Sequence, residues 1–574
     1  MFEIVLICLI AVALAIPLGS YMTGVFSGQK HITDGFFSPI ESVLYRLMRV
    51  NPNESMTWRT YGMAFLMSNL ILGVVAFLLL KFQQVLPFNP DHIGPLSWDV
   101  ALHTAISFIT NTNQQHYAGQ AQLSYLSQGF LIVTLQFVSP AMGLAICVAV
   151  LRGMIGGKNN KAAKEGEERD LGNYYVDVVR GVVRVFLPLS LIVALLLAWQ
   201  GVPSTFSCAQ HVQTLDTQSF MSSQTIPVGP VSAMVAIKQL GTNGGGWYGS
   251  NSADPLENPT PLSDVIETIA IVLIPIAVVF MAGGLIRRKK FAWMSFAAMA
   301  ILSVSFTAAT IYSENQANAA FVGASAMGPN MEGKEVRFGP ELSALWGALT
   351  TQTSNGSVNA SMDSFNPLGG LMARSGMLVN AIWGGVGCGF VNFIVYVWLA
   401  VFLSGLMIGR TPEIFGRKIE TKEVTLLSSL IVLPALCILG FTAIAVSFPS
   451  ITGNSNPGFH GISQVFYEYA SAFANNGSGM AGLKNDTPWW NLSAAFVILL
   501  GRYLPLVIPL MIAGLMAKKR VTPASSGGLT LETPTFCVTL IAIILVINVL
   551  SFLPAAVIGP IGEALQLSAV HVGN

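Results

Sequence analysis

Apolar residues gather in long runs along this chain, and shorter polar stretches separate them. A helix that crosses a membrane needs about 20 predominantly apolar residues, and ten runs reach that length. They lie near residues 2–25, 61–86, 124–151, 173–199, 262–286, 291–313, 371–409, 424–448, 488–516 and 533–556. The pattern predicts an all-α polytopic membrane protein with about ten transmembrane helices.

Composition supports this prediction and excludes several classes of function. Of the 574 residues, 53% are hydrophobic and 10% are charged, against roughly 25% charged in a soluble domain. The net charge of +1 is uninformative about nucleic acid, and no connection is basic enough, with interleaved aromatics, to suggest nucleic acid as a partner. The six cysteines form no CxxC pair, and the seven histidines show no metal-ligand spacing.

Basic residues predict the orientation of the chain in the lipid bilayer. They follow every second apolar run, at Lys30 to Arg59, Arg152 to Arg169, Arg287 to Lys290, Arg410 to Lys422 and Lys518 to Arg520. Connections rich in Lys and Arg remain in the cytoplasm. With ten spans, both termini are therefore expected outside the cytoplasm, and the chain is expected in the cell membrane.

Four of the outer connections share one pattern, a short helix-like stretch followed by a polar turn. They are VALHTAISFITNTNQQHY (100–117), AMVAIKQLGTNGGGWYGSN (233–251), ALWGALTTQTSNGSVN (344–359) and FYEYASAFANNGSGMAGL (466–483). Aligned on the turn, Asn113, Gly244, Gly356 and Gly477 hold the same place. The pattern predicts four copies of span, short helix, turn and span.

We therefore expect a single transmembrane domain over residues 1–574 with one extra helix at each end. Its expected parts are an extra first helix with a cytoplasmic loop (1–60), repeats 1 to 4 (61–172, 173–290, 291–423 and 424–520) and an extra last helix (521–574).

The chemistry of the four turns favours a pore for a monovalent cation. A single Asn-Gly pair is most often only a tight turn, but four in register between membrane spans indicate a shared role. Irregular backbone at membrane depth is tolerated where it is buried in protein or lines a water-filled cavity, and a ring of carbonyls can replace the hydration shell of a cation. Calcium and magnesium prefer carboxylates, which the turns lack. Potassium is the expected ion.

The same motifs resemble one family. GTNGGG (241–246), NSADPLENPTP (251–261), TNTN (110–113), NNGS (475–478) and GLMIGRTPEIFGRKIE (405–420) are similar to the potassium-binding A subunit of the bacterial Kdp potassium-transporting P-type ATPase. The resemblance implies high-affinity uptake of external potassium through a selectivity filter and an intramembrane tunnel. It implies as partners a catalytic P-type ATPase subunit, a single-span accessory subunit and, in some complexes, a very small fourth subunit.

The resemblance also implies which residues form the filter. They are Thr112, Asn113, Thr242, Asn243, Gly244, Ser354, Asn355, Gly356, Asn475, Asn476 and Gly477. Arg410 falls where the family has an arginine thought to block the direct cytoplasmic exit, although on the sequence alone it is equally a positive-inside anchor. Asn113 replaces the glycine of the other three turns, and Asn355 stands where well-known members have cysteine.

Three further features carry expectations. The seventh run is too long for one straight crossing and contains GGVGCGF (384–390), so it is either a broken helix lining a cavity or a tilted helix packed through its glycines. Arg502 is expected to pair or to reach the interface. Lys238 would repel an ion on the axis, so we expect it off the axis with an acidic or carbonyl partner.

The chain by itself is not expected to be an enzyme or to bind a cofactor. It contains neither a GxxxxGK[ST] phosphate loop nor a DKTG phosphorylation motif, and its spans show no nucleophile–base pair that would indicate an intramembrane hydrolase. ATP hydrolysis is therefore expected in a partner subunit. The alternative function is a self-sufficient potassium channel or symporter of the Trk/Ktr type.

Overall fold

The computed structural model describes residues 2–157, 170–216, 221–321, 328–454, 456–521 and 530–572. Within these ranges ten helices are long and apolar enough to cross a membrane, as the sequence predicts. They are Phe2–Ser27, Trp58–Lys81, Leu126–Met154, Tyr174–Trp199, Pro261–Leu285, Lys289–Glu314, Cys388–Ile408, Thr421–Ser447, Pro488–Ala517 and Pro534–Ala569. The basic residues Lys158, Lys161, Lys164 and Arg169 of the second predicted cytoplasmic connection lie outside the described residues.

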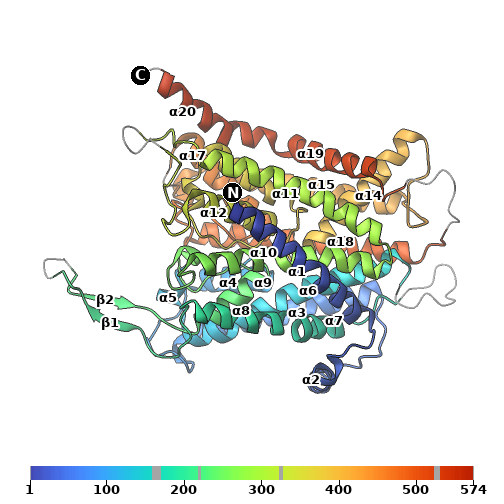
Figure 1. Cartoon of the computed structure of the whole chain (residues 1–574), viewed down its shortest axis with the longest axis horizontal. Helices are drawn as coiled ribbons and strands as arrows, with labels where there is room; N and C mark the ends of the chain where they lie inside the picture. The colour runs from blue at the N-terminus through green and yellow to red at the C-terminus, as the bar shows by residue number, and fades with distance from the viewer. Residues whose placement is uncertain are drawn as a thin grey trace.

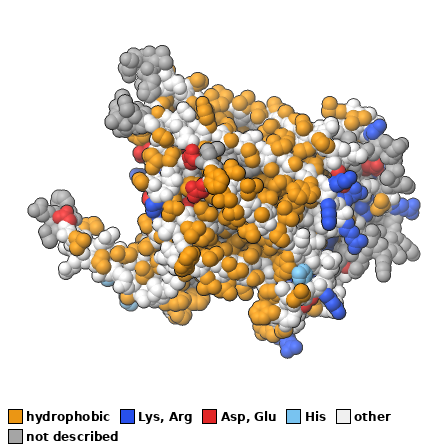
Figure 2. Space-filling view, in the orientation of Figure 1, with side chains coloured by type: hydrophobic (Ala, Val, Ile, Leu, Met, Phe, Trp, Pro, Cys, Tyr) orange, Lys and Arg blue, Asp and Glu red, His pale blue; other side chains and the backbone are white. Residues whose placement is uncertain are grey.

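The long helices run across the molecule from one end to the other (Figure 1). A broad apolar band covers the face between these ends, and Lys and Arg side chains gather at one of them (Figure 2). This end, which we call the basic end, carries the exposed side chains of Arg287 to Lys290 and of Arg410. The antiparallel hairpin of β1 (Gln210–Gln213) and β2 (Ser223–Ile226) projects from the opposite end.

Four short helices occupy the centre of the fold, one in each repeat. They are α4 (Trp98–Ile109), α9 (Val231–Leu240), α12 (Gly339–Gln352) and α17 (Gly458–Phe473). In α9 and α12 almost every side chain is buried. Because these helices end in irregular backbone, the surrounding spans must enclose that backbone and satisfy its polar groups.

Each short helix packs between the long helix before it and the helix after it in its own repeat. The pairs are α3 (Trp58–Lys81) and α6 (Val133–Met154) around α4, α8 (Leu187–Trp199) and α10 (Pro261–Leu285) around α9, α11 (Lys289–Glu314) and α13 (Pro367–Val379) around α12, and α15 (Thr421–Ser447) and α18 (Pro488–Ala517) around α17. The extra helices lie outside this plan: α1 (Phe2–Ser27) packs on α10, and α19 (Pro534–Ala556) packs on α11 and α15. The predicted fold class is thus confirmed.

Smaller elements connect or interrupt the spans. Wider π-helical turns lie at η2 (Leu126–Ile132), before α6, and at η3 (Gly181–Phe186), between α7 (Tyr174–Arg180) and α8. The remaining small elements are α2 (Asp34–Leu47), η1 (Gln83–Val85), α5 (Gly119–Gln122), η4 (Asn251–Ala253), η6 (Met362–Ser364), β3 (Glu413–Ile414), β4 (Arg417–Lys418), α16 (Pro449–Thr452), η7 (Val557–Ile561) and α20 (Gly562–Val572). The span Cys388–Ile408 is α14.

A histidine between two carboxylates attaches α20 to the rest of the molecule. The imidazole Nε2 of His460 lies 3.0 Å from Oδ1 of Asp363, and its Nδ1 lies 2.7 Å from Oε1 of Glu563 in α20. The hydrogen bond to Asp363, and to a smaller extent that to Glu563, raises the pKa of His460 from 6.5 to about 9. Burial acts in the opposite direction. Because the pKa of His460 is higher in the folded than in the unfolded chain, its protonated imidazole stabilises the fold. This contribution is complete below pH about 6.5 and is lost as the pH rises through about 9.

We therefore expect His460→Gln to lower the melting temperature of the purified protein at pH 6, and this difference from the unsubstituted chain to shrink above pH 9. Thermal unfolding measured at both pH values tests it, with the exposed His92 changed to Gln as the control. An equal loss of melting temperature at pH 6 and pH 10 would contradict the assignment.

Candidate functional site

The turns after the four short helices meet in one place. We call residues 111–114, 242–245, 354–357 and 475–478 together the loop ring. A Cβ atom added to Gly244 would lie 1.9 Å from the carbonyl oxygen of Asn355, one on Gly356 would lie 1.9 Å from that of Asn476, and one on Gly477 would lie 2.1 Å from that of Thr112. Each of these glycines therefore touches the backbone of the next loop, and only a residue without a side chain fits there.

The backbone of the loop ring follows the same alternation in all four loops. Two residues in each loop have positive φ, and the residue between them does not: Asn111 (65°) and Asn113 (52°), Thr242 (50°) and Gly244 (83°), Ser354 (50°) and Gly356 (88°), Asn475 (52°) and Gly477 (96°). Alternation of left- and right-handed residues turns successive carbonyl groups to the same side of a strand. The eight matched positions make the four loops equivalent in conformation as well as in sequence.

Asparagine side chains tie the loops to one another. Asn355 Nδ2 donates to the Lys238 carbonyl oxygen at 3.1 Å, and Asn476 Nδ2 donates to that of Thr350 at 2.9 Å. Asn111 and Asn475 make similar bonds to Thr242 O (2.9 Å) and Thr112 Oγ1 (3.0 Å), and the Asn243 carboxamide lies against that of Asn111. These five carboxamides are engaged within the protein, whereas the buried carboxamide of Asn113 has no hydrogen-bond partner. Backbone carbonyls are therefore the groups that all four loops have in common to face an ion.

The triple glycine compensates for the departure in the first loop. Asn113 has a side chain where the other loops have glycine, and a Cβ atom on Gly245 would lie 2.9 Å from Asn113 Cβ and 2.9 Å from Phe108 Cζ. A Cβ atom on Gly246 would likewise lie 2.9 Å from a carboxylate oxygen of Glu257. Gly244 thus completes the ring, while Gly245 makes room for Asn113 and Gly246 for Glu257.

The four short helices direct their C-terminal ends at the loop ring. Each helix ends within three residues of the first ring residue of its repeat. The C-terminal end of a helix carries a partial negative charge, and no Asp or Glu lies in the ring itself. Within the described residues, no cluster of three or more His, Cys, Asp or Glu side chains has the arrangement of a metal site. The ring is therefore electronegative through its backbone.

The seventh apolar run is a broken helix, so the broken-helix interpretation is confirmed over the tilted one. Between α13 and α14 the backbone has positive φ at Asn380 (46°), Gly384 (60°) and Gly387 (78°). A Cβ atom on Gly387 would lie 2.6 Å from Cα of Leu144. The break packs beneath the loop ring, where Ser354 Oγ lies 2.9 Å from Asn380 Oδ1.

Arg502 lies beside this break, at a small cavity beneath the ring. The cavity of about 20 Å³ is lined by Arg502, Ser354, Asn380 and Asn475, among others. The Arg502 guanidinium donates to Cys388 Sγ at 2.9 Å and to the Ser139 carbonyl oxygen at 3.0 Å, as the expected pairing requires. Its place beneath the ring was not predicted from the sequence, although a cation inside an apolar run is itself a signal of a functional position.

Arg410, the predicted gating residue, is not part of this cluster. It follows α14 at the basic end, where its side chain is exposed. The 21 residues of α14 separate it from the cavity by roughly 30 Å, at 1.5 Å per residue. Its role in gating stays a prediction.

Lys238 is off the ring with an acidic partner, as expected. Its ammonium group is buried, forms an ion pair with Glu257 and donates to Asn251 Oδ1 at 2.8 Å and Ser252 Oγ at 2.7 Å. Glu257 thus neutralises the positive charge of Lys238 behind the second loop, so that this charge does not face an ion in the ring.

Known proteins match this chain over nearly its whole length. The family model described as "Potassium-transporting ATPase A subunit" matches residues 5–565. The chain belongs to this family. Relatives named "Potassium-transporting ATPase potassium-binding subunit" include those of Gloeobacter violaceus (42% identical over 98% of this chain and 97% of the relative), Nostoc sp. (43%, 99% and 99%) and Geobacillus kaustophilus (43%, 98% and 98%).

A solved structure shares the fold of this family member. The potassium transporter TrkH from Vibrio parahaemolyticus superimposes with a TM-score of 0.50 over 89% of this chain and 98% of TrkH, at 13% sequence identity. The likeness concerns the fold alone.

The contact between Gly245 and Asn113 leads to a double-substitution test. We expect Gly245→Ala to lower the free energy of unfolding by about 1–3 kcal/mol through overpacking, and Asn113→Gly in the same chain to restore part of this loss. Thermal unfolding of the two single variants and the double variant measures it. The control is Gly370→Ala in α13, where an added Cβ meets nothing closer than 4.0 Å; purely additive effects of the two substitutions would contradict the contact.

Proposed function

We propose that this chain is the potassium-binding and translocating subunit of an ATP-driven potassium uptake complex in the bacterial cell membrane. The observation that carries the proposal is the match of positive φ at two positions in each of four abutting loops, because a shared backbone conformation lets four loops present neutral carbonyls in equivalent ways to one ion. Family membership supports potassium as the ion, and the names of the relatives support the role of potassium-binding subunit.

In this proposal the loop ring is the selectivity filter. Thr112, Asn243, Asn355 and Asn476 lie between the two left-handed residues of each loop, and their carbonyl oxygens are the first candidates for ion ligands. A ring of uncharged oxygens suits a large monovalent cation that sheds its water at low cost. Potassium is here the transported substrate and not a resident cofactor.

Beyond the filter, Arg502 and the break of the seventh span form the barrier to a straight passage. A fixed positive charge beneath a cation filter opposes continued movement along the axis. Ions then need a lateral route. We retain Arg410 as a second, cytoplasmic element of this barrier, in accord with its place at the basic end.

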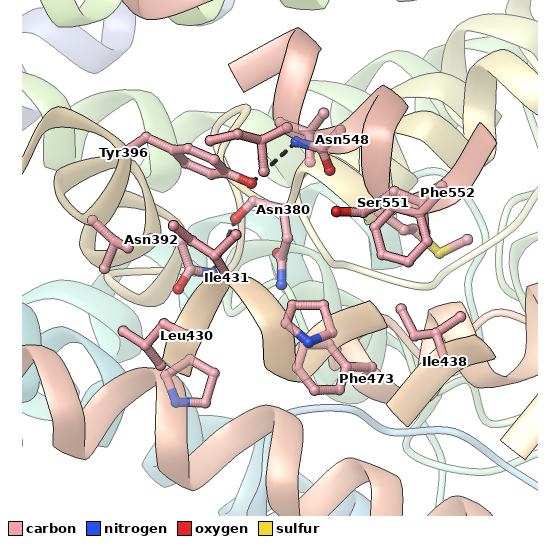
Figure 3. Close-up of a pocket in the computed structure, with 17 residues that line it drawn as sticks. Asn380, Asn392, Tyr396, Leu430, Ile431, Ile438, Phe473, Asn548, Ser551 and Phe552 are labelled. Atoms are coloured by element: carbon pink, nitrogen blue, oxygen red, sulfur yellow. Dashed lines mark hydrogen bonds between the residues drawn. The ribbon is translucent and has the colours of Figure 1, made fainter. Parts of the chain in front are cut away.

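A second cavity offers such a route (Figure 3). It measures about 70 Å³ and shares the lining residues Asn380, Asn392 and Pro505 with the cavity beneath the ring. Figure 3 shows Tyr396, Asn548 and Ser551 across from Asn380, with a hydrogen bond of 3.1 Å from Asn548 to Tyr396 Oη. These oxygens and carboxamides supply polar groups on a path toward α19, where a partner subunit would receive the ion.

ATP hydrolysis belongs in this proposal to a P-type ATPase partner. A single-span accessory subunit and, in some complexes, a very small fourth subunit are further members. The second candidate function, a self-sufficient channel or symporter of the Trk/Ktr type, draws on the shared fold with TrkH. Purification from the native membrane separates the two. Co-purification of a potassium-stimulated, vanadate-sensitive ATPase supports the complex, whereas potassium flux in liposomes by the chain alone supports the channel.

A substitution at one glycine of the loop ring tests whether the ring is the selectivity filter. We expect Gly356→Ala to raise the half-saturating potassium concentration for ATPase stimulation about tenfold or more, a change of ~1.4 kcal/mol, because the added Cβ meets the Asn476 carbonyl oxygen. The control is Gly440→Ala in α15, where an added Cβ meets nothing within 4 Å. Unchanged potassium dependence in Gly356→Ala would count against the filter.

A further inference from the structure

The second loop of the ring is held differently from the third and the fourth. In those two loops a hydroxyl of the short helix, six residues before the ring glycine, accepts from the glycine N–H: Thr350 Oγ1 from Gly356 at 2.9 Å and Ser471 Oγ from Gly477 at 3.0 Å. In the second loop this position is Lys238, whose ammonium group points to Asn251 and Glu257 instead.

Asn251 in turn binds the ring glycine from outside. Its Nδ2 donates to the Gly244 carbonyl oxygen at 2.7 Å, while its Oδ1 accepts from Lys238 Nζ at 2.8 Å. The Gly244 carbonyl therefore points toward Asn251. Within the described residues, the carbonyls of Gly356 and Gly477 receive no side-chain hydrogen bond.

Side-chain carboxamides also bind the carbonyl oxygens of the next two glycines, Gly245 and Gly246. Gln136 Nε2 donates to Gly245 O at 3.0 Å, and Gln115 Nε2 donates to Gly246 O at 2.9 Å. Three consecutive glycines restrict φ very little, so their peptide planes need external fixing. Three carboxamides supply it. That of Asn251 acts on Gly244, the ring glycine whose added Cβ would lie 1.9 Å from the Asn355 carbonyl oxygen of the third loop.

The position of Asn251 is itself fixed. It begins η4 with φ of 55°, and Lys238, with no exposed surface, holds its oxygen. Glu257 neutralises the ammonium group and accepts from the Tyr248 N–H at 2.9 Å. A buried charge pair with full hydrogen bonding fixes geometry more than it adds stability. A chain of polar contacts thus connects Glu257, Lys238, Asn251 and Gly244 in that order.

We propose that Asn251, oriented by the Lys238–Glu257 pair, is a positioning residue for ion selectivity: it turns the Gly244 carbonyl away from the ring and thereby fixes the second loop. The inference rests on the proposed function. Without the Asn251 amide the Gly244 carbonyl loses its side-chain hydrogen bond, and the second loop loses part of the fixed geometry by which a filter distinguishes potassium from ions of other size.

The test uses Asn251→Gly in the intact complex, because glycine accepts positive φ and introduces no charge. We expect the half-saturating potassium concentration for ATPase stimulation to rise about fivefold, the size of one lost net hydrogen bond, the preference for potassium over rubidium and sodium to fall, and the maximal rate to persist. The matched control is Asn89→Ala, which also removes an amide that donates to a backbone carbonyl (Ile93 O, 2.9 Å) but lies away from the ring.

A second variant addresses the orienting pair without leaving a lone buried charge. Lys238→Met with Glu257→Gln is expected to shift potassium dependence in the same direction as Asn251→Gly and by less. Loss of maximal rate in Asn251→Gly with unchanged half-saturation and ion preference would assign Asn251 a structural role and overturn the inference. Failure of the unsubstituted complex to respond to potassium would instead contradict the proposed function.

Discussion

The structure depends on the close approach of four backbone loops inside a membrane protein. Each ring glycine lies so near the carbonyl of the following loop that a side chain would overlap it, and the left-handed conformation at each of these positions excludes most residues. Backbone packed this tightly at membrane depth has no water to satisfy it. The rest of the fold follows from the need to enclose and bond these loops.

The helices and side chains around the loop ring repeat four times. They depart from this fourfold pattern where the sequence of one loop differs. The short helices are buried and direct their C-terminal ends at the ring, and Asn355 and Asn476 each bond the preceding repeat. Asn113 breaks the glycine pattern, and Gly245 in the neighbouring loop makes the space. Lys238 replaces a hydroxyl, and Glu257 and Asn251 balance its charge and its hydrogen bonds. These asymmetries give each loop its own support around a common backbone conformation.

The ten spans and the four loops were predictable from the sequence because both have local signals. The length of each apolar run indicates a span, and the polar turn at the same place in each repeat indicates a loop. The partner of Lys238 was predictable in kind, since a buried ammonium group requires an acid or a carbonyl. The place of Arg502 beneath the ring was not, because it depends on how α18 meets the break near Asn380. The contact of Gly245 with Asn113 also joins two repeats, and no local pattern encodes such a distance.

The most direct measurement is the position of bound thallium, a heavy substitute for potassium, in crystals of the complex, located by its anomalous scattering. The complex must first hydrolyse ATP in response to thallium. The account predicts density on the axis of the loop ring, among the carbonyl oxygens of Thr112, Asn243, Asn355 and Asn476. Thallium-stimulated hydrolysis with density elsewhere and none at the ring would contradict it.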